Sequence, residues 1–132
     1  MNISLPIPVM YYDTDAGGVV HNIAYLRHIE TARTLLGMEL GISFEKIIET
    51  QIHPVVLRTE IDYIRPAKFG DRILVNGKLG EVVGARFFVE FEILREGSLE
   101  LLVKCKQSIA LVKMPEGRPM RILQIYPQLR PA

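Results

Sequence analysis

The sequence predicts an α+β fold, in which one antiparallel sheet of about five strands wraps around a single long helix. Two observations lead to this prediction. Only one long segment has helical periodicity, and about four consecutive β-type segments follow it. One helix cannot cover both faces of a five-stranded sheet, so strands grouped after it indicate an α+β fold with the helix on one face.

The size of the chain fits one such domain. It has 132 residues, of which 48% are hydrophobic and 23% are charged. A chain of about 150 residues buries about two-thirds of its unfolded surface, which is enough for a substantial core. We therefore expect a single domain over residues 1–132.

The first predicted strand runs over residues 5–12, where apolar and β-forming side chains predominate. Pro6 and Pro8 restrict it to an edge position or a strand start, because proline has no N–H group to donate to a neighbouring strand. Residues 13–18 read D-T-D-A-G-G, which is the composition of a turn. The chain is therefore expected to turn before the helix begins.

The long helix is predicted from Asn22 to about Leu36. Apolar side chains recur there at i, i+3 and i+4 spacing, which forms one stripe along a helix. Asn22 is expected to cap the start, and Gly37 or Gly41 is expected to end the helix. His28 falls off the apolar stripe, so we expect it on the helix surface.

After this helix, Ser43 begins a short predicted helix that ends at Thr50. Four β-type segments come next, at residues 52–65, 72–81, 86–95 and 99–112. Prolines then recur between residues 115 and 131, which predicts a break after the last strand and a loose tail. This order of elements matches the hot-dog architecture, in which a sheet wraps around one helix.

Composition excludes several classes of protein. The net charge is +1, from 16 basic and 15 acidic residues, which argues against a dedicated nucleic-acid binder. Cys105 is the only cysteine, so the chain forms no intrachain disulfide and no multi-cysteine zinc site. The first eight residues do not read as a signal peptide, and no apolar segment approaches about 18 residues. We therefore expect a cytoplasmic protein with no membrane span and no cofactor.

The segment that points to chemistry is Y-Y-D-T-D-A-G-G-V-V-H-N, at residues 11–22. Free N–H groups at a helix start carry partial positive charge and stabilise a developing oxyanion. Glycines let the backbone approach a ligand closely, and a carboxylate beside such a site acts as nucleophile or general base. The segment thus supplies the groups needed for acyl transfer. The same residues also match an ordinary Asx turn that leads into a helix, so the pattern alone leaves both interpretations open.

This segment resembles the 4-hydroxybenzoyl-CoA thioesterase family of hot-dog-fold proteins, in particular its acyl-CoA thioesterase branch associated with the Tol–Pal genes. That family shows a motif like Y-x-D-T-D-A-G-G-V-V-Y-H-x-x-Y-L-x-x-x-E-x-A-R. The residues that match are Tyr12–Val20, Tyr25, Leu26, Glu30, Ala32 and Arg33, followed by Tyr63, Arg65–Ala67 and Phe69–Asp71. The resemblance therefore covers most of the chain.

The resemblance implies roles for several residues. The catalytic carboxylate is Asp15, which acts on an acyl-CoA thioester as nucleophile or base. The oxyanion donor is the backbone N–H of Asn22, and Gly18 helps to shape the pocket, which His21 and Tyr25 line. The family works as homodimers or homotetramers with active sites between subunits, and His53-Pro54 is expected to reach the acyl pocket of the neighbouring subunit.

Two departures from the family pattern keep alternatives open. His21-Asn22 stands where Tyr-His is commoner, which changes side chains beside the acyl pocket. Only Arg86 lies near the turn between the third and fourth strands, where aryl-CoA members carry a basic run. An acyl-carrier protein therefore stays open as the acyl donor. A non-catalytic acyl-CoA sensor is the second alternative, although Asp15 disfavours it because a carboxylate beside an apolar slot costs desolvation.

The remaining polar residues have simpler interpretations. Asp13 is expected to bond turn backbone rather than to pair with Asp15 in catalysis. No close histidine pair exists, so we expect no metal site. His53 is expected to line a pocket rather than act as a base, and Cys105 to be an inert buried thiol.

Overall fold

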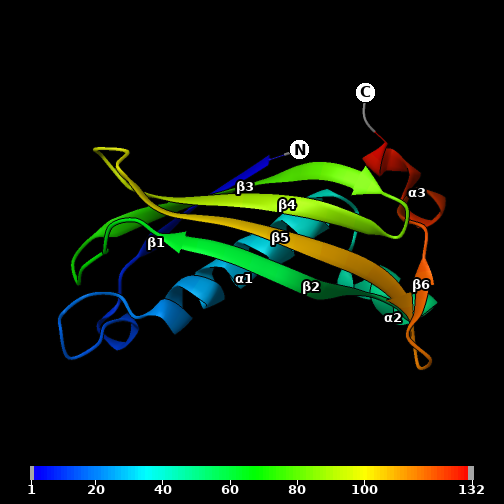
Figure 1. The fold of residues 1–132 in the computed structure, drawn as a ribbon, viewed down its shortest axis with the longest axis horizontal. Coiled ribbons are helices and arrows are strands. Elements are labelled where there is room, and N and C mark those ends of the chain that lie inside the picture. The colour runs from blue at the N-terminus through cyan, green and yellow to red at the C-terminus, as the bar shows by residue number, and fades with distance from the viewer. Residues whose placement is uncertain (1, 131–132) are drawn as a thin grey trace.

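The computed structural model describes residues 2–130, which form a six-stranded antiparallel sheet curled around one long helix (Figure 1). The strand order is β1-β3-β4-β5-β2, and the short β6 pairs with β5. The strands are β1 (Asn2–Pro8), β2 (Ile52–Tyr63), β3 (Arg72–Val83), β4 (Arg86–Arg95), β5 (Leu101–Lys113) and β6 (Arg118–Met120). The helices are α1 (Asn22–Glu39), α2 (Phe44–Thr50) and α3 (Ile122–Ile125), with 3-10 turns η1 (Tyr11–Asp13) and η2 (Pro127–Leu129). The predicted α+β class is confirmed, with β6 added to the expected five strands.

The core lies between α1 and the concave face of the sheet. Alternation along β4 buries Phe87, Val89, Phe91 and Ile93 on this face. The apolar stripe of α1 meets them with Ala24, Tyr25, Ile29, Ala32 and Leu36, all of which are buried. Cys105 of β5 lies on the same face and is also buried, as its position in the alternation predicts. Helix α1 therefore covers the concave face of the sheet and not the convex face.

The convex face carries rows of alternating charge. Lys78 of β3 lies opposite Glu90 of β4, Glu90 lies opposite Lys106 of β5, and Lys106 lies opposite Glu60 of β2. Opposite charges at facing cross-strand positions stabilise a sheet, and exposed side chains keep their hydration. The convex face is therefore suited to contact with solvent, and the apolar side chains of the sheet lie on its concave face.

Helix α1 is longer than predicted and is capped differently. It passes through Gly37 and ends at Glu39, with Leu40 as C-cap and Gly41 at φ +91° directly after it. The N-cap is His21 rather than Asn22, because the Nδ1 atom of its imidazole accepts a hydrogen bond from the N–H of Ala24. Asn22 is instead the first residue of the helix.

The two ends of the chain differ most from the prediction. β1 spans residues 2–8 instead of 5–12, because the chain then turns into η1. The C-terminal residues are not a loose tail: Ile122, Tyr126 and Leu129 are buried in the core. These three residues follow an apolar i, i+4, i+7 spacing. The prolines in this segment led instead to the prediction of a loose tail. Within residues 2–130, no helix combines the length and the apolar character needed to cross a membrane.

Candidate active site

The loop between η1 and α1 presents Asp15 at the surface. The carbonyl oxygen of Asp15 accepts a hydrogen bond from the N–H of Gly18 at 3.0 Å, and its Oδ1 atom accepts one from the N–H of Gly17 at 2.8 Å. Gly18 has φ +78°, a left-handed conformation that costs glycine little. The Asx turn expected from the pattern is therefore present, and it fixes the Asp15 carboxylate at an exposed position.

Asp15 lines a surface depression of about 320 Å³ at the start of α1. His21, Asn22 and Tyr25 line it from the helix side. The opposite wall comes from the end of β2 and the residues after it, namely Tyr63, Ile64, Arg65 and Pro66. Four of the predicted site residues are thus brought together in one depression.

The N–H group of Asn22 is available at this depression. Asn22 is the first residue of α1, so no preceding helical turn offers it a carbonyl oxygen. The N–H of His21 donates to the carbonyl oxygen of Asp13 and that of Ala24 donates to His21, whereas the N–H of Ile23 has no acceptor among residues 2–130. Among residues 2–130, the N–H of Asn22 has no acceptor. A free donor at a helix start is suited to an anion or an oxyanion.

The buried side chain of Asp13 connects this loop to α1. Its side chain is only 2% exposed, and its Oδ2 atom accepts a hydrogen bond from the N–H of Met10 at 3.0 Å. Arg27 and His28 of α1 each place a side-chain nitrogen 3.6 Å from one of its carboxylate oxygens. The sequence predicted His28 on the helix surface. In the structure, His28 is instead packed against the buried Asp13 carboxylate. Asp13 joins η1 to α1, which fits the structural role expected for it.

Burial and the nearby carboxylate act on His28 in opposite directions. Its Nε2 atom is buried and has no hydrogen-bond partner among residues 2–130. Burial lowers the pKa of His28 below its ordinary value of 6.5, and the attraction of Asp13 offsets this in part. His28 is therefore neutral in the folded protein at neutral pH.

Sequence reasoning did not assign the wall opposite Asp15 to the site. Tyr25 holds this wall, because its hydroxyl oxygen accepts a hydrogen bond from the N–H of Ala67 at 2.9 Å. The Tyr25 and Tyr63 rings lie 5.7 Å apart, and burial raises the pKa of Tyr25. The only sequence signal was that the segment from Tyr63 to Ala67 shares the family pattern, which says nothing of where it lies in space.

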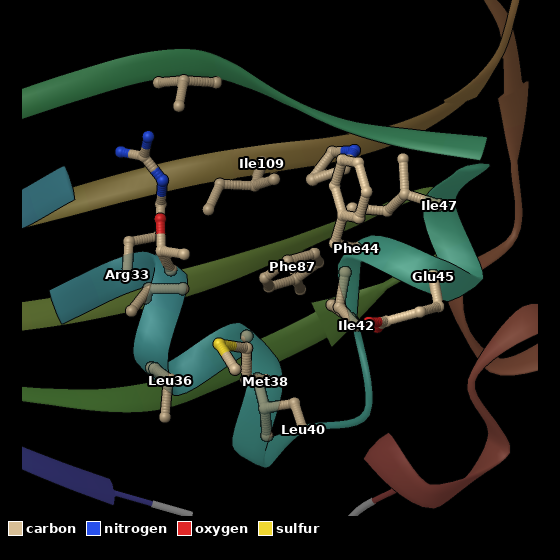
Figure 2. Close-up of a pocket in the computed structure, with 15 residues that line it drawn as sticks. Arg33, Leu36, Met38, Leu40, Ile42, Phe44, Glu45, Ile47, Phe87 and Ile109 are labelled. Atoms are coloured by element: carbon tan, nitrogen blue, oxygen red, sulfur yellow. The ribbon is translucent and has the colours of Figure 1, made fainter. Parts of the chain in front are cut away.

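A second cavity, of about 340 Å³, does not include Asp15 in its lining. Figure 2 shows the residues that line it. It is enclosed by the C-terminal half of α1, by α2 and by the concave face of the sheet, and its lining is mainly apolar, with Arg33, Thr34 and Glu45 as its polar members. Pro54, at the start of β2, lines this cavity, whereas His53 lines neither space. Within one chain, the predicted His53-Pro54 pair is therefore separated from Asp15 by the length of β2.

Cys105 lines neither the depression nor the cavity. Burial raises the pKa of the Cys105 thiol to about 11, so it is protonated and a poor nucleophile at neutral pH. Among the described residues, no three His, Cys, Asp or Glu side chains are grouped so as to hold a metal ion. Asp15 and Asn22 both line the depression at the start of α1.

The model of the thioesterase-like superfamily matches residues 9–125. The chain belongs to this superfamily. Among curated relatives, the acyl-CoA thioesterase YbgC of Haemophilus influenzae is 35% identical over 118 residues, which is 89% of this chain and 85% of that protein. The 1,4-dihydroxy-2-naphthoyl-CoA hydrolase of Synechocystis is 30% identical over 107 residues, covering 80% of this chain and 78% of that protein.

Solved structures of thioesterases share this fold. A 1,4-dihydroxy-2-naphthoyl-CoA thioesterase from Synechocystis superposes with a TM-score of 0.86 at 25% identity, over 96% of this chain and 93% of that one. A probable thioesterase from Bartonella henselae gives a TM-score of 0.80 at 30% identity, over 92% and 98% of the two chains. The hot-dog fold expected from element order is therefore confirmed for this member of the thioesterase-like superfamily.

Proposed function

We propose that this protein hydrolyses acyl-CoA thioesters, with Asp15 as the catalytic carboxylate and the backbone N–H of Asn22 as the oxyanion donor. The observation that carries this proposal is that Asp15 and the unpaired N–H of Asn22 line the same depression. Relatives named acyl-CoA thioesterase and 1,4-dihydroxy-2-naphthoyl-CoA hydrolase support the choice of substrate. A narrower assignment to the Tol–Pal-associated branch of the 4-hydroxybenzoyl-CoA thioesterase family rests on the D-T-D-A-G-G-V-V motif.

Hydrolysis of a thioester requires few groups from the protein. The thioester carbonyl oxygen accepts a hydrogen bond from Asn22, and the partial positive charge of the helix start stabilises the negative charge that develops there. The Asp15 carboxylate then acts in one of two ways. It attacks the carbonyl carbon, which expels CoA thiolate and leaves an anhydride for water to hydrolyse, or it removes a proton from the water that attacks. A thiolate leaves without a strong acid, because the pKa of a thiol, about 8.5, lies far below that of an alcohol.

The proposed active unit is a dimer that pairs the β2 strands of two copies. β2 is the last strand of the sheet, and its outer edge pairs with no strand among residues 2–130. Val55, Val56 and Leu57 on this strand are 40%, 38% and 52% exposed. An exposed apolar edge strand tends to pair with a strand of another chain. In the proposed dimer, a second copy related by a two-fold axis covers this edge. A homotetramer and a cytoplasmic location stay predictions from the sequence.

The first experiment measures thiol release from a panel of short, long and aromatic acyl-CoA thioesters. Asp15→Asn keeps the size of the side chain and is expected to lower kcat by at least about a hundredfold. The matched control is Glu81→Gln, the same change of carboxylate to amide at an exposed position of β3 outside the depression, which is expected to keep wild-type turnover. Equal activity in wild type and Asp15→Asn contradicts the assignment of Asp15.

The same assay separates the two alternatives. If wild type binds acyl-CoA but releases no thiol from any thioester, the proposed hydrolysis of acyl-CoA is wrong. Acyl-carrier-protein thioesters are then offered in the same assay. Release from these identifies the carrier protein as the donor, whereas binding without any release identifies a sensor.

A further inference from the structure

The turn between β2 and β3, at residues 66–71, contains part of the family motif but has no role in the proposed chemistry. It lies at the same end of the sheet as the loop before α1 (Figure 1). Pro66 at its start lines the Asp15 depression, whereas Asp71 at its end does not. The turn therefore forms part of a wall of the depression without supplying a reacting group.

This turn is paired with the loop that carries Asp15. The carbonyl oxygen of Ala67 accepts a hydrogen bond from the N–H of Val20 at 2.8 Å. Lys68 forms an antiparallel bridge with Val19. The carbonyl oxygen of Val19 in turn accepts a hydrogen bond from the N–H of Asp15 at 2.9 Å. A shift of the turn is therefore passed through paired backbone to Asp15.

Arg95, the last residue of β4, binds both ends of the turn. Its Nη2 atom donates to the carbonyl oxygen of Pro66 at 3.1 Å, and its Nη1 atom donates to the Oδ2 atom of Asp71. The same Asp71 oxygen accepts a hydrogen bond from the N–H of Lys68 at 2.9 Å. The Arg95 and Asp71 side chains are each only 25% exposed, so solvent screens their attraction less than that of a surface pair.

The shape of the guanidinium group explains why arginine suits this position. Its N–H groups form a rigid planar fork, which binds two acceptors in fixed directions. Lysine carries a compact ammonium group on a flexible stem instead. In Arg95→Lys, the attraction to Asp71 is therefore kept, but Pro66 is no longer held in the same geometry.

We propose that Arg95 is a positioning residue for Asp15, which acts through the Asp71 carboxylate and the turn at residues 66–71. This assignment deepens the proposed thioesterase function and rests on it. Arg95 does not line the depression, so its loss leaves the substrate contacts there in place. Its loss instead shifts the Asp15 carboxylate relative to the thioester carbonyl. A displacement of about 1 Å between reacting groups costs about a hundredfold in rate.

A separate contact keeps the turn attached to α1 when Arg95 is replaced. The hydroxyl oxygen of Tyr25 accepts a hydrogen bond from the N–H of Ala67 at 2.9 Å, and both residues are buried. An Arg95 variant is therefore expected to fold, with the turn held at one point instead of three.

Three substitutions separate positioning from a general loss of stability. Arg95→Met removes the guanidinium group and keeps an aliphatic side chain, whereas Arg95→Lys keeps the charge. The matched control is Arg72→Met on the neighbouring strand, which removes an ion pair with Glu96 at 2.9 Å. Among residues 2–130, the Arg72 side chain makes no hydrogen bond or ion pair with the turn.

The experiment combines steady-state hydrolysis of the best acyl-CoA substrate with amide hydrogen exchange, at a temperature where circular dichroism shows every variant folded. Arg95→Met is expected to lower kcat about tenfold to a hundredfold and to change KM less than about twofold. The amides of Asp15 and Val20 are expected to exchange at least about tenfold faster, because the turn no longer holds their acceptors in place. Arg95→Lys recovers part of the lost kcat, and Arg72→Met keeps wild-type kcat and exchange.

The outcomes separate this proposal from the proposed function. A lower kcat together with faster exchange of the two amides in Arg95→Met supports positioning by Arg95. Faster exchange in Arg95→Met, when wild type releases no thiol, supports the link between Arg95 and the Asp15 loop but overturns the hydrolase. Wild-type exchange of both amides in Arg95→Met overturns positioning by Arg95, whatever the kcat. Equal losses of kcat in Arg95→Met and Arg72→Met also overturn it.

Discussion

At the scale of single residues, the two aspartates of the D-T-D motif have different environments and different contacts. Asp15 is exposed at the depression, and among residues 2–130 its carboxylate accepts a hydrogen bond only from the N–H of Gly17. Asp13 is buried two residues earlier, where it bonds the N–H of Met10 and faces Arg27 and His28. Two carboxylates so close in sequence therefore do not share one site, and only the exposed one is placed to meet a substrate.

The buried contact between His28 and Asp13 makes stability depend on pH. Burial lowers the pKa of folded His28 below 6.5, so the unfolded chain takes up a proton at this residue at a higher pH than the folded chain does. The free energy of unfolding is therefore expected to fall as the pH drops below about 6.5. In His28→Gln this contribution is absent, so the variant is expected to lose less stability between pH 7.5 and pH 5.

Urea unfolding of wild type and His28→Gln at the two pH values tests this expectation. His21 and His53 are present in both proteins, so their contributions cancel in the comparison. An equal or larger loss of stability in the variant contradicts the expected effect. A larger loss would mean that the attraction of Asp13, which raises the pKa, outweighs the burial of His28.

At the scale of secondary structure, the start of α1 allows its oxyanion role to be tested by a single substitution. Asn22 is the first residue of the helix, a position that proline favours because its missing N–H has no partner there. His21 before it is extended, with φ −79° and ψ 157°, as a residue that precedes proline must be. Asn22→Pro is thus expected to fold while removing only the proposed donor.

We expect Asn22→Pro to lower kcat about a hundredfold to a thousandfold, the cost of losing one oxyanion donor. Asn22→Ala keeps the backbone N–H and is expected to stay near the wild-type kcat. Thiol release and circular dichroism of both variants give the measurement. A folded Asn22→Pro variant with wild-type turnover would exclude this N–H group from the mechanism.

Regular elements were predictable where one local pattern determined them. The strict alternation of β4 predicted the same bounds, residues 86–95, that the structure has. The Asp15 turn and the helix start were predictable because they are contiguous in the sequence. The wall at Tyr63 was not, because only the sheet brings the end of β2 beside α1. The C-terminal residues were predicted wrongly, because prolines outweighed the three buried apolar side chains that anchor them.

At the scale of the whole molecule, a single chain keeps the Asp15 depression and the apolar cavity apart. The depression with Asp15 and the apolar cavity lie at opposite ends of β2, and five elements of the fold build the cavity. No single segment of sequence therefore signals the cavity. In the proposed dimer, pairing of the exposed apolar edges of β2 brings the cavity of one copy toward the Asp15 depression of the other.

This arrangement predicts that two inactive variants restore each other. Asp15→Asn lacks the carboxylate but keeps an open cavity. Gly37→Leu keeps Asp15 and fills the cavity that Gly37 lines, which we expect to exclude the acyl chain of decanoyl-CoA. A mixed dimer then pairs Asp15 of the Gly37→Leu subunit with the open cavity of the other. Random exchange makes half of the dimers mixed, with one intact site of two, so about a quarter of wild-type decanoyl-CoA turnover is expected.

Co-expression of the two variants, followed by a thiol-release assay with decanoyl-CoA, measures this recovery. A mixture of Asp15→Asn with Asp15→Asn carrying a different tag is the control, and it is expected to stay inactive. If each subunit used its own Asp15 and its own cavity, no mixed dimer would contain an intact site. Activity no higher than the average of the two variants would therefore exclude a site shared across the β2 edges.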